Sequence, residues 1–289
     1  MAETRIPVDL LNPGQVFACL GLLEAAEVLC GEAEGGFDWS DQAAVRFVLR
    51  AAGEGNPVAK VMEFLSEASV FSVSPLHSGL STTKPWSVPT RQAADETFPF
   101  PAPNSPATLP ALLEDTKGRQ IQIEYWGDAT CRDAVKFWAG SGGYPGAALA
   151  RDALELIRHA ATSAVEDPFA VSAPQSSSFR LDWRRDYVPV ELGFSLNEHT
   201  STMTMMGFPL VELLAAIGLQ NARPLRLDRL SYRYAVLGTC VPPLLFRPAL
   251  GCAPLPFPGM ARSFRMRLGW PGQEGQARCI IDVIEDSTP

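Results

Sequence analysis

The chain has 289 residues, of which 46% are hydrophobic and 19% are charged. These fractions are close to globular averages, so they exclude a disordered chain and a coiled-coil rod. The net charge is −8 and the pI is about 5.0. The acidic excess lies in residues 1–144, whereas Arg180 to Arg278 contain 12 arginines against 7 acids. Such an excess suits phosphate or carboxylate binding, and it equally suits an ordinary solvated surface.

Targeting and metal signals are missing from the sequence. No 18-residue apolar run occurs, and the first thirty residues lack the pattern of a secretory signal. We therefore expect a cytoplasmic protein with no membrane contact. The six cysteines form no CxxC pair and there are only three histidines, so we expect reduced thiols, no metal site and no cofactor.

The first 75 residues alternate between strand and helix patterns. Asn12-Pro13 and Asn56-Pro57 each join a helix-capping residue to a proline at the first helical position. Apolar spacing predicts helices over about 13–29 and from 57, and strands at 5–11, 37–39, 45–50 and 69–73. The order β-α-β-β-α-β predicts an α+β protein with a ferredoxin-like core, an arrangement shared with RNA-binding RRM domains. We treat residues 1–75 as this unit.

The remainder is predicted to be an insertion followed by a second α+β region. Residues 76–118 are rich in proline, serine and threonine, which is typical of a long loop. Residues 119–289 should pack on the first unit, or continue it as one domain. We expect a strand at 119–126, helices at 147–161 and 209–217, and additional C-terminal antiparallel strands at 232–236, 264–268 and 277–283.

A glycine-rich segment from Gly140 to Gly146 is the first candidate anion site. Glycines let backbone N–H groups approach a phosphate, and a helix follows them. Two basic residues precede the segment at a spacing that shares one helix face. A tight turn between helices explains the segment equally well. The candidate contacts are Arg132, Lys136, Gly140, Gly142 and Gly143.

Two further segments combine arginines with hydroxyls or aromatic residues. In the first, Phe179, Leu181 and Trp183 alternate with charged residues, as a surface that grips a nucleic-acid backbone would. The alternative is a core of these three side chains with solvated ion pairs to Asp182 and Asp186. Its candidate contacts are Ser176, Ser177, Arg180, Arg184 and Arg185. The second is a basic stripe that suits an interface or a solvated face: Arg223, Arg226, Arg229 and Arg233.

No catalytic signature was found. The sequence lacks a G-x-S-x-G nucleophile motif, a Walker A loop and an HExxH zinc motif. The three histidines lie in unrelated contexts. We therefore predict that the protein is not an enzyme.

Four groups of residues resemble a known family. They are IPVDLLNPGQVFACLG at Ile6–Gly21, WGDAT at Trp126–Thr130 with VKFWAG at Val135–Gly140, APQSSSFR at Ala173–Arg180, and Trp270–Arg278. Together they resemble a CRISPR-associated protein family of subtype I-G, formerly called I-U. The resemblance covers the chain nearly from end to end.

The resemblance implies a function and a set of partners. That family is similar to a non-nuclease subunit of an RNA-guided interference complex, related to the repeat-associated RAMP proteins, whose cores are ferredoxin-like. The implied partners are other CRISPR effector subunits, guide RNA and target DNA, with cleavage left to a separate enzyme. The pI near 5.0 departs from a usual nucleic-acid-binding subunit. Two alternatives remain: a small-molecule enzyme that uses Gly140–Gly146 for phosphate, and a protein-only adaptor.

Overall fold

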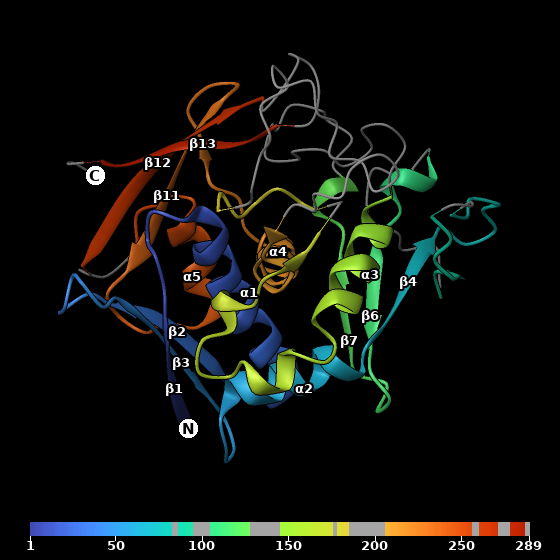
Figure 1. Cartoon of the computed structure of the whole chain (residues 1–289), viewed down its shortest axis with the longest axis horizontal. Helices are drawn as coiled ribbons and strands as arrows, with labels where there is room; N and C mark the ends of the chain where they lie inside the picture. The colour runs from blue at the N-terminus through green and yellow to red at the C-terminus, as the bar shows by residue number, and fades with distance from the viewer. Residues whose placement is uncertain are drawn as a thin grey trace.

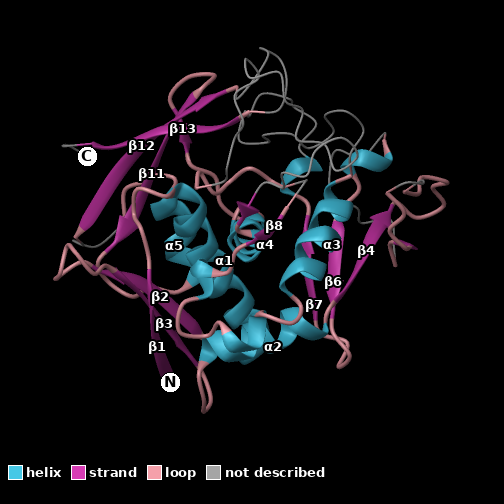
Figure 2. Cartoon of the chain, viewed as in Figure 1, coloured by secondary structure: helices cyan, strands magenta, loops and turns pink. Residues whose placement is uncertain are grey.

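The computed structural model shows an α+β protein with several sheets (Figure 2). It describes residues 1–82, 86–94, 105–127, 145–175, 178–184, 206–255, 260–270 and 278–286. The predicted α+β class is confirmed. The first elements are β1 (Ala2–Pro7), α1 (Pro13–Cys30), β2 (Ala33–Asp38), β3 (Arg46–Ala51), α2 (Pro57–Glu67) and β4 (Ser69–Ser74). This order confirms the predicted sequence β-α-β-β-α-β.

The two Asn-Pro pairs begin helices, but their asparagine side chains differ in role. Asn56 caps α2, because its Oδ1 accepts from the N–H groups of Val58 at 2.8 Å and Ala59 at 3.2 Å. Asn12 makes no such cap at α1. Its Nδ2 instead donates to Oδ1 of Asp182 at 3.0 Å, inside the protein. The same Asn-Pro motif therefore provides a helix cap at α2 and a long-range contact at α1.

The strands of the first 75 residues divide between two sheets. β1, β3 and β2 form an antiparallel sheet in that order. β4 belongs to a second sheet of order β5-β4-β6-β7, in which β5 (Thr90–Gln92) is parallel to β4, and β6 (Ala111–Glu114) and β7 (Gln120–Ile123) complete the antiparallel part. The segment 76–118 is thus not all loop, since it supplies β5 and β6. The helix α3 (Gly146–Ile157) lies beside β6 (Figure 1).

Helices α1 and α4 (Pro209–Gly218) pack backbone against backbone in the middle of the molecule (Figure 1). A Cβ atom added to Gly21 of α1 would lie 1.9 Å from the carbonyl oxygen of Leu214. One added to Gly218 would lie 2.2 Å from the carbonyl oxygen of Phe17. Only glycine permits this separation. By length and composition α1 could span a membrane, yet it is mostly buried here as a core helix.

The third sheet confirms the predicted C-terminal antiparallel strands. Its order is β10 (Leu225–Arg226), β11 (Ser231–Leu237), β12 (Ala261–Gly269) and β13 (Cys279–Asp286). A fifth helix, α5 (Pro243–Leu250), lies between β11 and β12 in the chain and was not expected. Two short strands, β8 (Ala173–Pro174) and β9 (Met206–Gly207), pair separately.

One hydrophobic core joins the helices α1 to α5 and strands from each of the three larger sheets. It includes Phe17 from α1, Leu113 from β6 and Phe264 from β12. The inner face of the C-terminal sheet contributes Tyr234, whose ring stacks on Phe264 at 5.3 Å and whose hydroxyl donates to the carbonyl oxygen of Leu10 at 2.7 Å. The core therefore crosses the predicted boundaries of 1–75, 76–118 and 119–289, and that division stays a prediction.

Candidate nucleic-acid interface

Many of the sequence-predicted contacts fall on residues that the structure does not describe. They include the two basic residues that precede the glycine-rich segment, its three candidate glycines and part of the serine-arginine segment. These predictions stay untested, and they concern Arg132, Lys136, Gly140, Gly142, Gly143, Ser176, Ser177 and Arg185.

The described part of the second candidate segment, residues 178–184, forms no strand. Arg180 has a φ of 63°, in the left-handed region, which interrupts any extended run. Phe179 and Leu181 are fully buried, and so is Asp182. The alternation in the sequence thus reflects a buried irregular segment.

Arg184 is held by protein groups on several sides. Its Nη2 lies 2.6 Å from Oδ2 of Asp182 and donates to the carbonyl oxygen of Phe169 at 2.9 Å. Its guanidinium also lies 3.5 Å from the ring centroid of Phe208. These contacts correspond to the ion-pair alternative for Arg184, because a phosphate would have to displace a buried carboxylate.

A buried glutamate fixes the backbone of the same segment. Glu212, in the first turn of α4, is 1% exposed. Its carboxylate accepts from the N–H of Leu181 at 3.0 Å and from that of Asp182 at 3.0 Å. A carboxylate that accepts backbone N–H groups is a strong charge-assisted contact. The segment is therefore anchored to α4 as part of the interior.

The first two arginines of the third candidate differ from each other. Arg223 donates to the carbonyl oxygens of Tyr125 at 3.0 Å and Ala222 at 3.2 Å, and also to that of Leu219. Arg223 therefore joins the chain at the end of α4 to the backbone of Tyr125. Arg226, on β10, is exposed, and its Nε donates to the carbonyl oxygen of Asp228 at 3.2 Å. Arg226 alone of this pair presents an accessible guanidinium.

The outer face of the C-terminal sheet gathers arginines from two adjacent strands. In β12, Arg265 and Arg267 are exposed, and they alternate with the buried Met266 and Leu268. Arg233 of β11 is the register partner of Arg265. Because strand side chains alternate between faces, these three arginines share the outer face. We call Arg233, Arg265 and Arg267 the arginine face. The alternation of arginine with apolar residues in β12 was the sequence signal that could have found it.

The electrostatics of the arginine face are uneven. Asp286 of β13 lies between the facing pair, with Oδ2 2.7 Å from Nε of Arg233 and Oδ1 3.6 Å from Nη2 of Arg265. Like charges opposite each other in a sheet are unfavourable, so Asp286 compensates them. Arg267 has no ion-pair partner in the described part of the chain, although Asp282 is its register partner. Among the described residues, Arg267 of this face has no ion-pair partner, and Arg265 is half-exposed.

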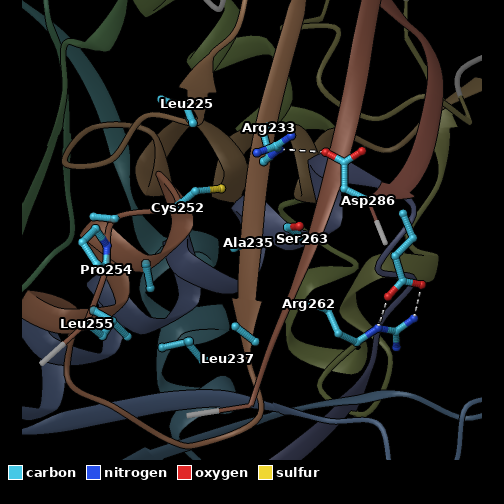
Figure 3. Close-up of a pocket in the computed structure, with 14 residues that line it drawn as sticks. Leu225, Arg233, Ala235, Leu237, Cys252, Pro254, Leu255, Arg262, Ser263 and Asp286 are labelled. Atoms are coloured by element: carbon cyan, nitrogen blue, oxygen red, sulfur yellow. Dashed lines mark hydrogen bonds and ion pairs between the residues drawn. The ribbon is translucent and has the colours of Figure 1, made fainter. Parts of the chain in front are cut away.

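A cavity of about 560 Å³ opens beside the arginine face, between β11 and the chain that follows α5 (Figure 3). Its walls are mainly aliphatic, with Leu225 near one end and Leu237 near the other (Figure 3). Arg233 and Asp286 supply its polar side, together with the hydroxyl of Ser263. Cavities of this volume, with apolar walls and a few polar groups, are typical of small-ligand sites.

Cys252 lines this cavity in an unfavourable backbone conformation. It lies two residues after the end of α5 and has a φ of 59°. Its N–H donates to the carbonyl oxygen of Ala249 at 2.9 Å, and the next N–H, of Ala253, donates to that of Pro248 at 3.0 Å. This is a Schellman motif, in which glycine usually occupies the left-handed position. Burial raises the pKa of the Cys252 thiol, so it faces the cavity as a neutral group at pH 7.

In the parts of the chain that the structure describes, no group of three or more histidine, cysteine or acidic side chains is placed to hold a metal ion. The comparisons with models of protein families, with curated proteins and with solved structures found no match to this chain. The functional argument therefore depends on the resemblance of the sequence blocks and on the geometry described above.

Proposed function

We propose that this protein is a non-catalytic subunit of a type I-G CRISPR RNA-guided interference complex and contacts nucleic acid through the arginine face. The observation that carries the proposal is the pair Arg265 and Arg267, exposed side by side on one strand. In a β-strand, residues two apart are separated by about 7 Å. The two guanidiniums can therefore contact successive phosphates of an extended nucleic-acid strand. Arginine suits this contact because its planar fork binds phosphate bidentately.

The first sheet also supports the proposal. The sheet order β1-β3-β2, with α1 between β1 and β2 in the chain and α2 after β3, is the order of the first three strands in a ferredoxin-like unit. In such a unit the fourth strand would lie beside β1, whereas β4 pairs with β5 and β6 here. We propose that the chain has a ferredoxin-like, RAMP-related core whose fourth strand has been recruited into a larger second sheet.

The overall charge supports a subunit held mostly by proteins. With a net charge of −8, most of the surface repels a polyanion. We propose that other effector subunits bind this acidic surface, and that guide RNA or target DNA meets only the arginine face. A cytoplasmic location follows from this assignment.

The test is co-expression of the chain with the neighbouring subunits and guide RNA, followed by purification of the complex. Arg265→Ala with Arg267→Ala should leave assembly intact and weaken target binding. Arg46→Ala is the matched control, because Arg46 is an exposed arginine at the start of β3, which belongs to the first sheet and not to the C-terminal sheet. Failure to co-purify with any CRISPR subunit or guide RNA would refute the proposal. Loss of a subunit at unchanged affinity would favour a protein-only adaptor.

A further inference from the structure

We propose that the cavity beside the arginine face is a pocket for a single unstacked nucleobase of a strand bound on that face. This inference rests on the proposed function and adds the chemical group that enters the cavity. The size of the cavity, its charge balance and its position next to Arg265 all fit a base.

The size and walls of the cavity suit a base. Its volume of about 560 Å³ exceeds that of a nucleoside, and its long walls are formed by Leu225, Leu237, Pro254 and Leu255. An unstacked base needs apolar surface against its flat faces, because it has lost the neighbouring bases. In Figure 3, Leu237 lies on the strand side of the cavity, and Pro254 and Leu255 lie on the loop side.

The charges in the cavity select a neutral ligand. Arg233 is balanced by Asp286 at 2.7 Å, and Arg262 is balanced by Glu285 at 2.7 Å. A phosphate or carboxylate inside would therefore meet two carboxylates as well as two guanidiniums. A base is uncharged and has donors and acceptors on one edge, so it matches a polar side with a guanidinium, a carboxylate and a hydroxyl. The hydroxyl is that of Ser263.

The position of the cavity connects it to the phosphate contacts. Asp286, which lines the cavity, lies 3.6 Å from Arg265, and Arg265 is the register partner of the cavity residue Arg233. A strand whose phosphates lie on Arg265 and Arg267 would therefore pass the mouth of the cavity. Its nearest base can enter while the charged backbone stays outside.

The strained Cys252 is consistent with a site shaped for a ligand. Non-glycine residues in the left-handed region cost about 1 kcal/mol or more and cluster at binding sites. In Figure 3 the sulfur of Cys252 points toward Arg233, across the width of the cavity. Glycine would remove the strain but also this neutral wall group.

The experiment uses the full chain and short single-stranded RNA and DNA oligonucleotides that contain one 2-aminopurine, a base whose fluorescence increases when it is unstacked. We expect fluorescence to rise on binding for one register of the label. An abasic nucleotide at that register should weaken binding by roughly tenfold, the order expected when one base contact is lost. Ser263→Leu, which fills the cavity without changing charge, should remove both effects and leave the thermal melting temperature within a few degrees.

The two proposals fail in different ways. If Arg265→Ala with Arg267→Ala weakens binding while the abasic nucleotide and Ser263→Leu do not, the arginine face binds nucleic acid and the base pocket is refuted. If none of these changes affects binding, the proposed function fails together with the pocket. The abasic oligonucleotide is tested on the unmodified protein. It therefore tests the base pocket even if the Ser263→Leu variant misfolds.

Discussion

Replacement of Arg184 by alanine should destabilise the protein instead of weakening nucleic-acid binding. The Asp182 carboxylate is completely buried and the Arg184 side chain is 31% exposed. In the variant, Asp182 would keep two donors, Nδ2 of Asn12 at 3.0 Å and the backbone N–H of residue 184 at 2.8 Å. Removing one partner of a fully buried pair costs about 3–5 kcal/mol.

The expected loss of unfolding free energy is smaller than for a fully buried pair, because the guanidinium is partly solvated and the carboxylate keeps two hydrogen bonds. We expect about 2 kcal/mol, which for a chain of this size corresponds to a fall of roughly 4 °C in melting temperature. Arg184→Lys should fall between wild type and alanine, because lysine keeps the charge but cannot match the planar fork.

The assay is thermal unfolding followed by circular dichroism, with oligonucleotide binding measured on the same samples. Arg46→Ala serves as the control for removing one exposed charge and should change stability by no more than about 0.5 kcal/mol. An unchanged melting temperature for Arg184→Ala, combined with weaker nucleic-acid binding, would refute the ion-pair reasoning and restore Arg184 as a phosphate contact.

Substitutions at three other positions test the packing and the charges, each by its effect on the unfolding free energy or on its pH dependence. Gly21→Ala should destabilise by more than about 3 kcal/mol, since its Cβ would overlap the Leu214 carbonyl oxygen of α4 and push the helices apart; wild-type stability would contradict the close packing. Cys252→Gly should stabilise by about 0.5–1 kcal/mol in urea titrations, whereas Cys252→Ala should not, because only glycine relieves the positive φ. The Arg262 guanidinium lowers the pKa of Glu285 by hydrogen bonding, so this pair stabilises the fold above the unfolded pKa of about 4.5 and loses its effect as pH falls through the lowered value. Arg262→Ala should therefore reduce the drop in melting temperature between neutral pH and pH values below about 4.5, and an identical drop in both proteins would count against this contribution.

Elements with strong local signals could be predicted from the sequence. The Asn-Pro pairs at Asn12 and Asn56 mark the starts of α1 and α2, because proline is favoured at the first helical position. Apolar periodicity gave the order of the first six elements. The helix α5 was missed because Pro243 and Pro248 are typical of irregular chain, although the structure accepts Pro248 inside the helix.

Sheet membership could not be predicted from local patterns. β4 has the apolar alternation of a strand, and that pattern is satisfied by any partner with a free edge. Its antiparallel pairing with β6 depends on chain more than 35 residues away, as the register of Ser69 with Glu114 shows. A local pattern determines which face of a strand is buried, not which neighbour it joins.

The candidate site shows the same difference between features that local patterns predict and features that depend on tertiary contacts. The sequence left Arg184 as either a phosphate contact or an ion pair, since the choice depends on whether Asp182 is buried, which is a tertiary property. Arg265 and Arg267 were not among the predicted contacts, although the local signal was sufficient, because arginines that alternate with apolar residues in a strand must share one face. The number of arginines along the chain does not reveal that face. Such a count does not distinguish an arginine bonded to backbone carbonyls, such as Arg223, from an exposed one, such as Arg267.

The acidic residues of β13 lower the affinity of the arginine face for nucleic acid. Asp282 and Asp286 stand beside Arg267 and Arg265 in register or in contact, so they lower the local positive potential that a strand would meet. With the net charge of −8, this predicts weak binding of nucleic acid by the isolated chain. Each of the two arginines that contacts a phosphate would contribute about 0.7 to the slope of log affinity against log salt for a single strand. For two contacts, a fourfold rise in salt concentration would then lower the affinity roughly sevenfold. Partner subunits that supply further positive charge would raise the affinity without changing this contribution, so the double variant should reduce the slope of the assembled complex by about 1.4. An unchanged slope would show that the arginines do not touch phosphate.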